Sequence, residues 1–260
     1  MRIQRIEQIE QYIIEHNTAT LEELCEKFGI SINTIRRDIN ELIKGGNIEK
    51  VYGGVRAALK KPGGYAGLIS YSERHIKNQE MKNRIDRLAA DCIQSGDSIF
   101  IDTGTTTSGM VDYLGEKENV TIITNSIEAA HKALAYPSLR LIVLPGILNH
   151  KTASLVGSGC IDYLYHFNIK KAFMACTCIS LSSGGSNATH EEYEIKKEVL
   201  KNSREHYLLV DHTKFDQTSL CTYGHIQDFQ CILTDQAPSQ EYLDTFEKYG
   251  IDLKVCPPQP

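Results

Sequence analysis

Apolar residues recur with the period of an α-helix in two short blocks between residues 20 and 42. In the first block they fall at i, i+3, i+4 and i+7, at Leu21, Leu24, Cys25 and Phe28. Thr20 and Glu23 have the spacing of a capping box, which predicts a helix that begins directly after Thr20. Gly29 is expected to end this helix, because glycine readily adopts the positive φ of a helix terminus.

A second helix is expected after Ser31, whose hydroxyl can cap it. Its apolar positions are Ile32, Ile35, Ile39 and Leu42. The other face carries side chains that, together with Ser31, are candidates for DNA contact, namely Asn33, Thr34, Arg36, Arg37 and Asn40. A short helix, a glycine turn and a helix with an arginine-bearing face are typical of a DNA-reading helix-turn-helix. The alternative is a helical hairpin with a solvated charged face.

The next residues predict a small β-hairpin. Glycines 45 and 46 stop the helix, and residues 48–51 and Val55 are the strand positions, with the turn at Gly53-Gly54. A helix-turn-helix followed directly by such a hairpin is a winged helix, and its wing can lie along a phosphate backbone or a minor groove. The available wing contacts are Lys50, Tyr52 and Arg56.

A different pattern begins after a segment with little periodicity. Residues 57–72 contain Pro-Gly-Gly and are expected to be a linker. An amphipathic helix is predicted to run from Glu73 to Cys92. Short apolar strands then alternate with helical stretches near residues 126–135 and 191–202. The predicted strands are 98–102, 120–124, 139–144, 171–175, 206–211 and 230–235.

This alternation predicts a mostly parallel sheet covered on both faces. The predicted fold class is therefore α/β, with an N-terminal winged helix-turn-helix domain and a larger α/β domain. We place the first domain at residues 1–56, the linker at 57–72 and the second domain at 73–260.

Polar residues follow the carboxyl ends of several predicted strands, where ligands of parallel sheets bind. After the first strand come Asp102, Thr103, Gly104, Thr105 and Thr106, directly before a predicted helix. Two later strand ends carry Thr124, Asn125, Ser126, Asp211 and Lys214. Hydroxyls and backbone N–H groups at a helix start suit an anion such as phosphate. Each segment alone could be only a helix cap, but their shared edge favours a ligand pocket.

Composition excludes several classes of protein. The chain is 41% hydrophobic and 23% charged, which is ordinary for a globular protein, and no run approaches a membrane span. The N-terminus has no apolar signal core, so a cytoplasmic protein is expected. The eight cysteines show no C-x-x-C pair, so we expect no metal and no cofactor.

Charge is unevenly distributed along the chain. The net charge is −5, yet the first 60 residues hold nine basic and nine acidic residues, so this part is formally neutral. The basic residues Arg36, Arg37, Lys50 and Arg56 fall on the predicted reading helix and wing. The low basicity predicts modest non-specific DNA affinity, so tight binding should need two copies of the domain.

These segments resemble the DeoR family of bacterial transcriptional regulators. The N-terminal similarity lies in SINTIRRDINELIKGGNIEKVYGG, and the C-terminal one in RHIKNQEMKNRIDRLAA, DTGTTT, TNS, EEYEIKKEVL and VDHTKF, in the family's order. The resemblance implies a regulator, usually a repressor, of a sugar-catabolic operon, released by a phosphorylated sugar metabolite. It implies a sensor domain similar in fold to ribose-5-phosphate isomerase, and we expect a homodimer or homotetramer on a double-stranded DNA operator, with no membrane association.

Carried over by position, the family pattern implies effector contacts from Asp102, Thr103, Gly104, Thr105, Thr106, Asn125, Lys196 and Lys214. Arg74 and Lys82 also match it, although a solvated helix face explains both equally well. The chain departs from the pattern in the wing, where it has Lys50 and Tyr52 in place of arginine and histidine. It also departs at residues 145–147, Pro-Gly-Ile, and at 175–178, Ala-Cys-Thr-Cys, where relatives have more glycine. Each lost glycine adds a Cβ, so a narrower and less polar pocket wall is expected there.

Two other functions remain open at this point. The second domain could be a sugar-phosphate isomerase-like enzyme, with a base among Asp102, Asp211, Glu191 and Glu194. The spacing supplies no second carboxylate that would complete an acid–base pair, and a fused DNA reader fits reversible sensing better. Alternatively, the helix-turn-helix could contact protein instead of DNA.

Overall fold

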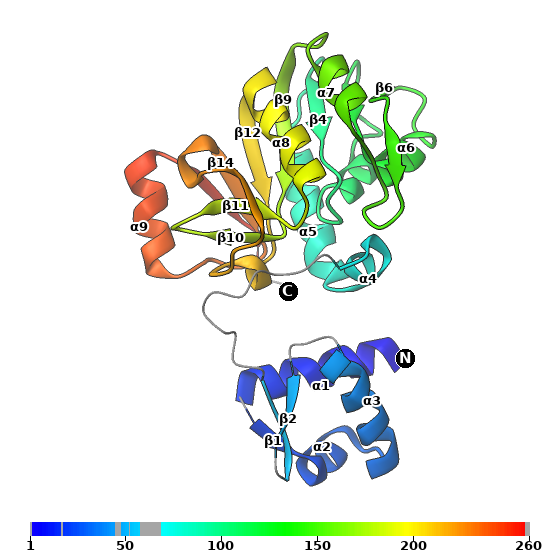
Figure 1. The fold of residues 1–260 in the computed structure, drawn as a ribbon, viewed down its shortest axis with the longest axis vertical. Helices are drawn as coiled ribbons and strands as arrows, with labels where there is room; N and C mark the ends of the chain where they lie inside the picture. The colour runs from blue at the N-terminus through cyan, green and yellow to red at the C-terminus, as the bar shows by residue number, and fades with distance from the viewer. Residues whose placement is uncertain (1, 17, 45–47, 52, 58–68, 258–260) are drawn as a thin grey trace. The chain divides into compact units, whose positions relative to one another are not determined.

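The chain divides into two compact units, residues 1–64 and 65–260, which we call the N-terminal unit and the C-terminal unit (Figure 1). The computed structural model describes residues 2–16, 18–44, 48–51, 53–57 and 69–257. Most of the expected linker lies outside the described residues. Its last part, however, belongs to the C-terminal unit, because Ser70 caps helix α4 (Tyr71–Ile76). None of the helices in these ranges has the length and apolar character that a membrane crossing requires.

The N-terminal unit is a winged helix. Its elements are α1 (Arg2–His16), β1 (Thr18–Thr20), α2 (Leu21–Phe28), α3 (Ile32–Lys44), β2 (Ile48–Val51) and β3 (Gly54–Ala57). β2 and β3 form the predicted antiparallel hairpin, with Gly53 at a φ of 84° in its turn. β1 pairs with the other side of β3 and gives the sheet order β1-β3-β2. Three residues are too few to show strand alternation, and β1 is absent from the sequence prediction.

The predicted start and end of α2 are confirmed. The Thr20 hydroxyl accepts a hydrogen bond from Glu23 N at 3.1 Å, and the Glu23 carboxylate accepts one from Thr20 N at 2.8 Å. Gly29 ends the helix at a φ of 63°. The helices pack on one apolar core of Ile9, Ile13, Leu24, Ile35, Ile39, Leu42, Ile48 and Val55. Ile32, expected in this core, is instead 37% exposed at the first position of α3.

The C-terminal unit is built on a seven-stranded parallel sheet with the order β15-β14-β12-β9-β4-β5-β6. The strands are β4 (Ser98–Ile101), β5 (Thr121–Thr124), β6 (Arg140–Val143), β9 (Ile169–Ala175), β12 (Ser203–Leu209), β14 (Cys231–Thr234) and β15 (Asp252–Val255). All but β15 were predicted. The α/β fold class is confirmed.

Helices cover both faces of this sheet, as the apolar runs of its strands require. They are α5 (Gln79–Ala90), α6 (Ile127–Ala133), α7 (Ser158–Leu164), α8 (His190–Asn202), α9 (Gln240–Tyr249) and the 3₁₀ helices η1 (Ser108–Tyr113), η2 (His212–Lys214) and η3 (Ile226–Asp228). Residues of α5, η1 and α6 share one core with Phe173 of β9. Residues of α7, α8 and α9 share the other core with Ala172 and Met174, so β9 alternates between the two cores.

Two small antiparallel sheets were not predicted from the sequence. One is the hairpin of β7 (Ile147–Asn149) and β8 (Ser154–Val156). The other joins β10 (Cys178–Ser180), β11 (Gly184–Asn187) and β13 (Cys221–Gly224). Strands of three or four residues, some rich in glycine and serine, carry too little alternation to be recognised.

Two helix predictions need correction. The single helix expected between Glu73 and Cys92 is split into α4 and α5, because Asn78 adopts a left-handed conformation with a φ of 57°. The helix expected after the threonine-rich segment is η1, a 3₁₀ helix of six residues. Such a short helix offers little dipole for an anion, so hydroxyls and cations have to supply most of the attraction.

Candidate functional site

The exposed face of α3 is the candidate DNA-contacting surface. Ile35, Ile39 and Leu42 are buried and orient the helix, which leaves Arg36 and Arg37 in solvent. Within the described residues, neither of these two guanidinium groups makes a hydrogen bond or an ion pair. Asn33 and Asn40 are exposed as well, so these four of the six predicted polar side chains can be reached by a ligand.

A buried contact fixes the orientation of this helix. Asp38 is fully buried and accepts hydrogen bonds from Nε and Nη2 of Arg5 on α1, at 2.9 and 2.8 Å. At the start of α3 the hydroxyl groups of Ser31 and Thr34 lie 3.0 Å apart, and Thr34 N donates to the Ser31 carbonyl at 2.9 Å. Ser31 and Thr34 therefore stabilise the helix start in addition to any role at DNA.

The wing presents fewer groups than the sequence suggested. Lys50 is exposed on β2. Arg56 on β3 pairs across the hairpin with Glu49 of β2, which reduces its availability to a phosphate group. Tyr52 lies outside the described residues.

In the C-terminal unit, the carboxyl ends of β4, β5, β9 and β12 meet at one sheet edge. At its centre, Asp102 forms an ion pair with Lys196 of α8 and accepts a hydrogen bond from Ala175 N at 2.8 Å. Lys196 also donates to the Ala175 carbonyl at 2.6 Å and lies 5.1 Å from the centre of the Tyr223 ring. Only 1% of Asp102 and 3% of Lys196 is exposed. These two predicted effector contacts thus connect β4, β9 and α8, whatever else they bind.

The threonine-rich segment is packed tightly beneath this edge. Thr103, Thr105 and Thr106 are buried with 3%, 8% and 7% exposure. Thr107 donates to the carbonyls of Asp102 and Gly104, which holds the segment in a compact turn. A Cβ on Gly104 would lie 2.2 Å from the Ala175 Cβ, so only glycine fits there.

The end of β5 supplies one unsatisfied acceptor. Thr124 donates to the Ile101 carbonyl at 2.6 Å, and Ser126 caps α6 by accepting from Ala129 N at 3.2 Å. Asn125 donates through Nδ2 to the Leu155 carbonyl at 2.9 Å, but its buried Oδ1 has no hydrogen-bond partner among the described residues. Thr124 and Ser126 are structural, whereas Asn125 has an oxygen that a ligand hydroxyl could satisfy.

Cations gather beside the same edge. Lys82 is 5% exposed and donates to the backbone carbonyls of Arg74 and Lys77. Burial lowers the pKa of Lys82 to about 8, with Asp211 opposing that shift and Lys214 adding to it. Nε and Nη2 of Arg74 are buried and have no hydrogen-bond partner in the part of the chain that the structure describes.

The buried position of Lys82 argues against the solvated helix face that the sequence left open. Lys82 and Asp86 both lie on the buried stripe of α5 with Ile85 and Ala89. Charged residues at stripe positions are a signal that sequence reasoning could have used, and Asp86 was missed. Tyr71 of α4 was missed as well; its hydroxyl lies 2.8 Å from the Ser108 hydroxyl.

The carboxyl end of β12 adds the carboxylate of Asp211 to these cations. Asp211 is 1% exposed and accepts through Oδ1 from the backbone N and the hydroxyl of Thr213. Its Oδ2 is buried and has no hydrogen-bond partner among the described residues. Beside one sheet edge there are thus a desolvated ammonium group and several buried guanidinium and oxygen atoms that lack a hydrogen-bond partner among the described residues. Such a set can bind a ligand that carries both an anion and hydroxyl groups.

The departures from the family pattern lie at the same edge. Ala175 packs against Gly104, so its methyl group fills space that a glycine would leave open. At residues 145–147, Gly146 is retained where a Cβ would lie 2.7 Å from the Val156 carbonyl oxygen, and Ile147 is 77% exposed. Ile147 therefore adds no bulk to the buried part of the edge.

Comparisons with known proteins agree for both units. The model of the DeoR-like helix-turn-helix domain matches residues 5–61, and that of the DeoR C terminal sensor domain matches residues 77–236. Among solved structures, ribose 5-phosphate isomerase A from Methanocaldococcus jannaschii is 21% identical, with a TM-score of 0.41 over 54% of this chain and 55% of that one.

Relatives with curated names match over nearly their whole length. The HTH-type transcriptional regulator IolR of Bacillus subtilis is 40% identical over 98% of this chain and 100% of the relative. The transcriptional repressor GlcR of the same organism is 30% identical over 97% and 95%. The glycerol-3-phosphate regulon repressor of Escherichia coli is 28% identical over 97% and 98%. On these matches the chain belongs to the DeoR family of helix-turn-helix transcriptional regulators.

Proposed function

We propose that the protein is a repressor of a sugar-catabolic operon and that a phosphorylated sugar metabolite releases it from its operator. The exposed arginines of α3, which pair with none of the described residues, support operator reading. Arginine is the side chain that most often reads guanine in the major groove, through two parallel hydrogen bonds. The names of the relatives, which include repressors, support the sign of the regulation.

The observation that carries the effector proposal is the Arg74 guanidinium beside the buried ammonium of Lys82. The buried Nε and Nη2 of Arg74 have no hydrogen-bond partner among the described residues. Desolvated cations without an anionic partner are costly, and a phosphoryl group would satisfy both. Phosphate is doubly charged near pH 7 and has three strong acceptor oxygens. Lys214 lies close enough to influence the pKa of Lys82 and can contribute as a third cation. Asn125 and Asp211 then offer oxygens to sugar hydroxyls.

The proposed mechanism is thermodynamic linkage between two sites. A homodimer or homotetramer would present two α3 helices to major grooves about 34 Å apart. An effector that favours an arrangement incompatible with this spacing lowers operator affinity. Coupling free energies of about 1–3 kcal/mol correspond to roughly 5- to 150-fold changes in affinity.

The test is a fluorescence-anisotropy titration of operator DNA with the full-length protein. Pentose and hexose phosphates, the matching unphosphorylated sugars and inorganic phosphate are added in turn. At least one sugar phosphate should weaken binding at least fivefold, and its unphosphorylated sugar should not. A panel without any effect would contradict the effector proposal, while saturable turnover of a sugar phosphate would favour an enzyme instead.

A further inference from the structure

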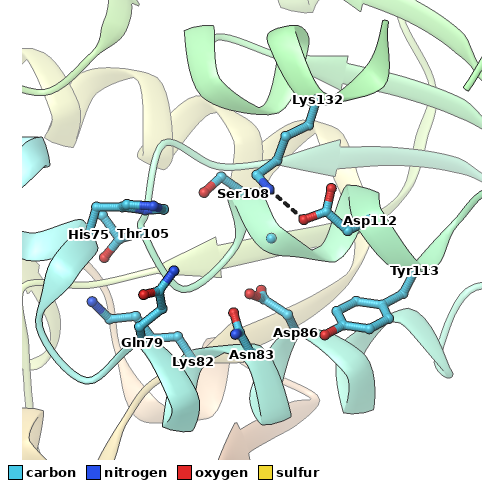
Figure 2. A pocket seen from close by; sticks show the side chains of 11 residues that line it. His75, Gln79, Lys82, Asn83, Asp86, Thr105, Ser108, Asp112, Tyr113 and Lys132 are labelled. Carbon is cyan, nitrogen blue, oxygen red and sulfur yellow. Dashed lines mark hydrogen bonds and ion pairs between the residues drawn. The ribbon is translucent and has the colours of Figure 1, made fainter. Parts of the chain in front are cut away.

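A small polar cavity lies beside Lys82, one of the proposed phosphate contacts. It has a volume of about 200 Å³ and lies between α4, α5, η1 and α6. Lys82, Asn83 and Asp86 of α5 line one side, and Thr105, Ser108 and Gly109 line the other. Figure 2 shows the Asp86 carboxyl group turned toward the space between α5 and η1. We call this space the Asp86 cavity.

Burying Asp86 at this position is energetically unfavourable. The residue is 1% exposed, and its Oδ1 has no hydrogen-bond partner among the described residues. Its other carboxyl oxygen, Oδ2, would lie 2.1 Å from a Cβ on Gly109, so the glycine makes room for the carboxyl group. A buried polar atom without a partner destabilises a fold, and an apolar side chain would fit this helix stripe without that penalty. The backbone of Met110 in η1 hydrogen-bonds to the Asp86 carboxyl group, which accounts for one of its oxygens, while Oδ1 is left for a ligand.

Burial and neighbouring charges shift the pKa of the Asp86 carboxyl group. Burial raises the pKa of Asp86 well above its usual range, with Asp112 adding to the shift and Lys132 and Lys82 opposing it. Lys132 cannot neutralise Asp86 fully, because it forms an ion pair with Asp112 at the cavity wall (Figure 2). The partnerless Oδ1 can accept a hydrogen bond from a ligand hydroxyl group whether or not the carboxyl group is protonated.

The cavity shares two lining residues with the proposed effector site. Lys82 and Thr105 line the cavity and also belong to the candidate effector contacts. A ligand whose phosphoryl group binds Arg74 and Lys82 can therefore extend its carbon chain into the cavity. The lining is polar on all sides, which disfavours an apolar group, and the Asp112 carboxylate disfavours a second anion.

We propose that the Asp86 cavity binds the hydroxyl-bearing carbon chain of the effector, with the Asp86 carboxyl group paired to one hydroxyl. This inference rests on the proposed phosphosugar sensing. It assigns the effector to phosphorylated polyols or sugars that carry at least one hydroxyl group away from the phosphate. It also makes Asp86 a specificity-determining residue.

Isothermal titration calorimetry of the full-length protein tests the assignment. The ligands are inorganic phosphate, glycerol 3-phosphate, ribose 5-phosphate, fructose 6-phosphate and glucose 6-phosphate. The variants are Asp86→Ala, the isosteric Asp86→Asn and Asn83→Ala, which alters an exposed residue of the cavity wall and leaves the core intact. Asp91→Asn is the matched control, because Asp91 is exposed at the end of α5 and does not line the cavity.

For wild type, at least one sugar phosphate should bind at least tenfold more tightly than inorganic phosphate. Asp86→Ala should lose at least tenfold of that sugar-phosphate affinity and keep its affinity for inorganic phosphate. Asn83→Ala should lose a smaller part of the affinity by which the sugar phosphate exceeds inorganic phosphate.

Two outcomes would overturn the inference, and they differ. If the Asp86 and Asn83 variants bind sugar phosphates as wild type does, Asp86 is not a ligand contact, but phosphosugar sensing stands. If wild type binds none of the phosphorylated ligands, the proposed function fails together with the inference.

Discussion

At the scale of single residues, the molecule keeps several polar groups where burial alone would not place them. Arg74, Asn125 and Asp211 each have at least one buried polar atom without a hydrogen-bond partner in the described residues. Such atoms are uncommon in folded proteins and call for a ligand, an ion or water. On α3 the opposite holds, since Arg36 and Arg37 are exposed and form no ion pair with any residue that the structure describes. The cations of the proposed DNA site are therefore exposed to water before binding, whereas those of the proposed effector site are largely buried.

We expect Arg36→Ala and Arg37→Ala to weaken operator binding without altering the fold. If an arginine contacts a guanine edge, its loss costs about 1–3 kcal/mol and is concentrated at particular base positions. The measurement is anisotropy with the operator and single-base variants of it. Arg140→Ala, an exposed arginine on β6 in the other unit, is the control and should bind normally. Normal binding by both α3 variants would contradict DNA reading by this helix.

Effector affinity should depend on pH through Lys82. The groups around it are Arg74, Asp86, Asp211 and Lys214. Burial lowers the pKa of Lys82 to about 8, so the protein without ligand loses this charge above that pH, and phosphate binding must restore the proton. Affinity should be flat from pH 7 to 8 and then fall by up to about tenfold per pH unit.

Calorimetry in buffers of different ionisation enthalpy measures the proton taken up on binding. Lys82→Met should remove the pH dependence, and an absence of proton uptake by wild type at pH 9 would contradict the assignment. The same shift has an effect on stability. The unfolded chain, with a pKa of 10.5, keeps the proton longer, so stability should rise with pH between about 8 and 10.5.

At the scale of elements, tertiary contacts decide more than local pattern does. The six predicted sheet strands and α2 follow from apolar periods and capping signals, which are local. The split between α4 and α5 is not local, because it depends on Asn78 in a left-handed conformation and on Lys82 bonding back to α4. The ion pair between Asp102 and Lys196, far apart in sequence, also follows only from the fold.

The candidate site divides in the same way. The strand-end segments could be predicted, since parallel strands bring their carboxyl ends together. Which side chains of those segments make contacts within the fold, and which are left for a ligand, could not be predicted. Thr124 donates to the Ile101 carbonyl, Ser126 caps α6, and Arg56 pairs with Glu49 across the hairpin. Apolar periods do not reveal which polar side chains make such contacts. Asp86 could have been noticed as an acid on a buried helix stripe.

We expect Lys196→Met to destabilise the C-terminal unit strongly. The substitution leaves Asp102 buried without its cation, and breaking a buried pair from one side costs about 3–5 kcal/mol. Urea unfolding measures the loss. Lys197→Met is the matched control, because Lys197 is exposed and contacts only Tyr193 among the described residues. Equal stability of the two variants would show that the pair is not a structural connection.

At the scale of the whole molecule, the proposed effector site and the proposed DNA-contacting surface belong to separate compact units. Every proposed effector contact lies in residues 65–260, and every proposed DNA contact lies in residues 1–64. A ligand stabilises the unit that binds it by about 2.7 kcal/mol when present at 100 times its Kd.

Differential scanning calorimetry of the full-length protein should therefore show two responses. A bound sugar phosphate should raise the transition of the C-terminal unit, while operator DNA should raise that of the N-terminal unit. Because the two ligands are proposed to oppose each other, adding both should stabilise the protein less than the sum of the separate effects. Strict additivity would mean that no coupling connects the two sites.

The position of α4 gives this coupling a short covalent route. The chain leaves the DNA-reading unit, passes through residues 58–68, and enters α4 at Ser70, only four positions before Arg74. Tyr71 is held by the Lys151 carbonyl and by the Ser108 hydroxyl, so α4 is attached to the rim of the effector site on two sides. A metabolite that draws the Arg74 guanidinium inward would thus act on the first helix of the C-terminal unit, and no signal would have to cross the sheet.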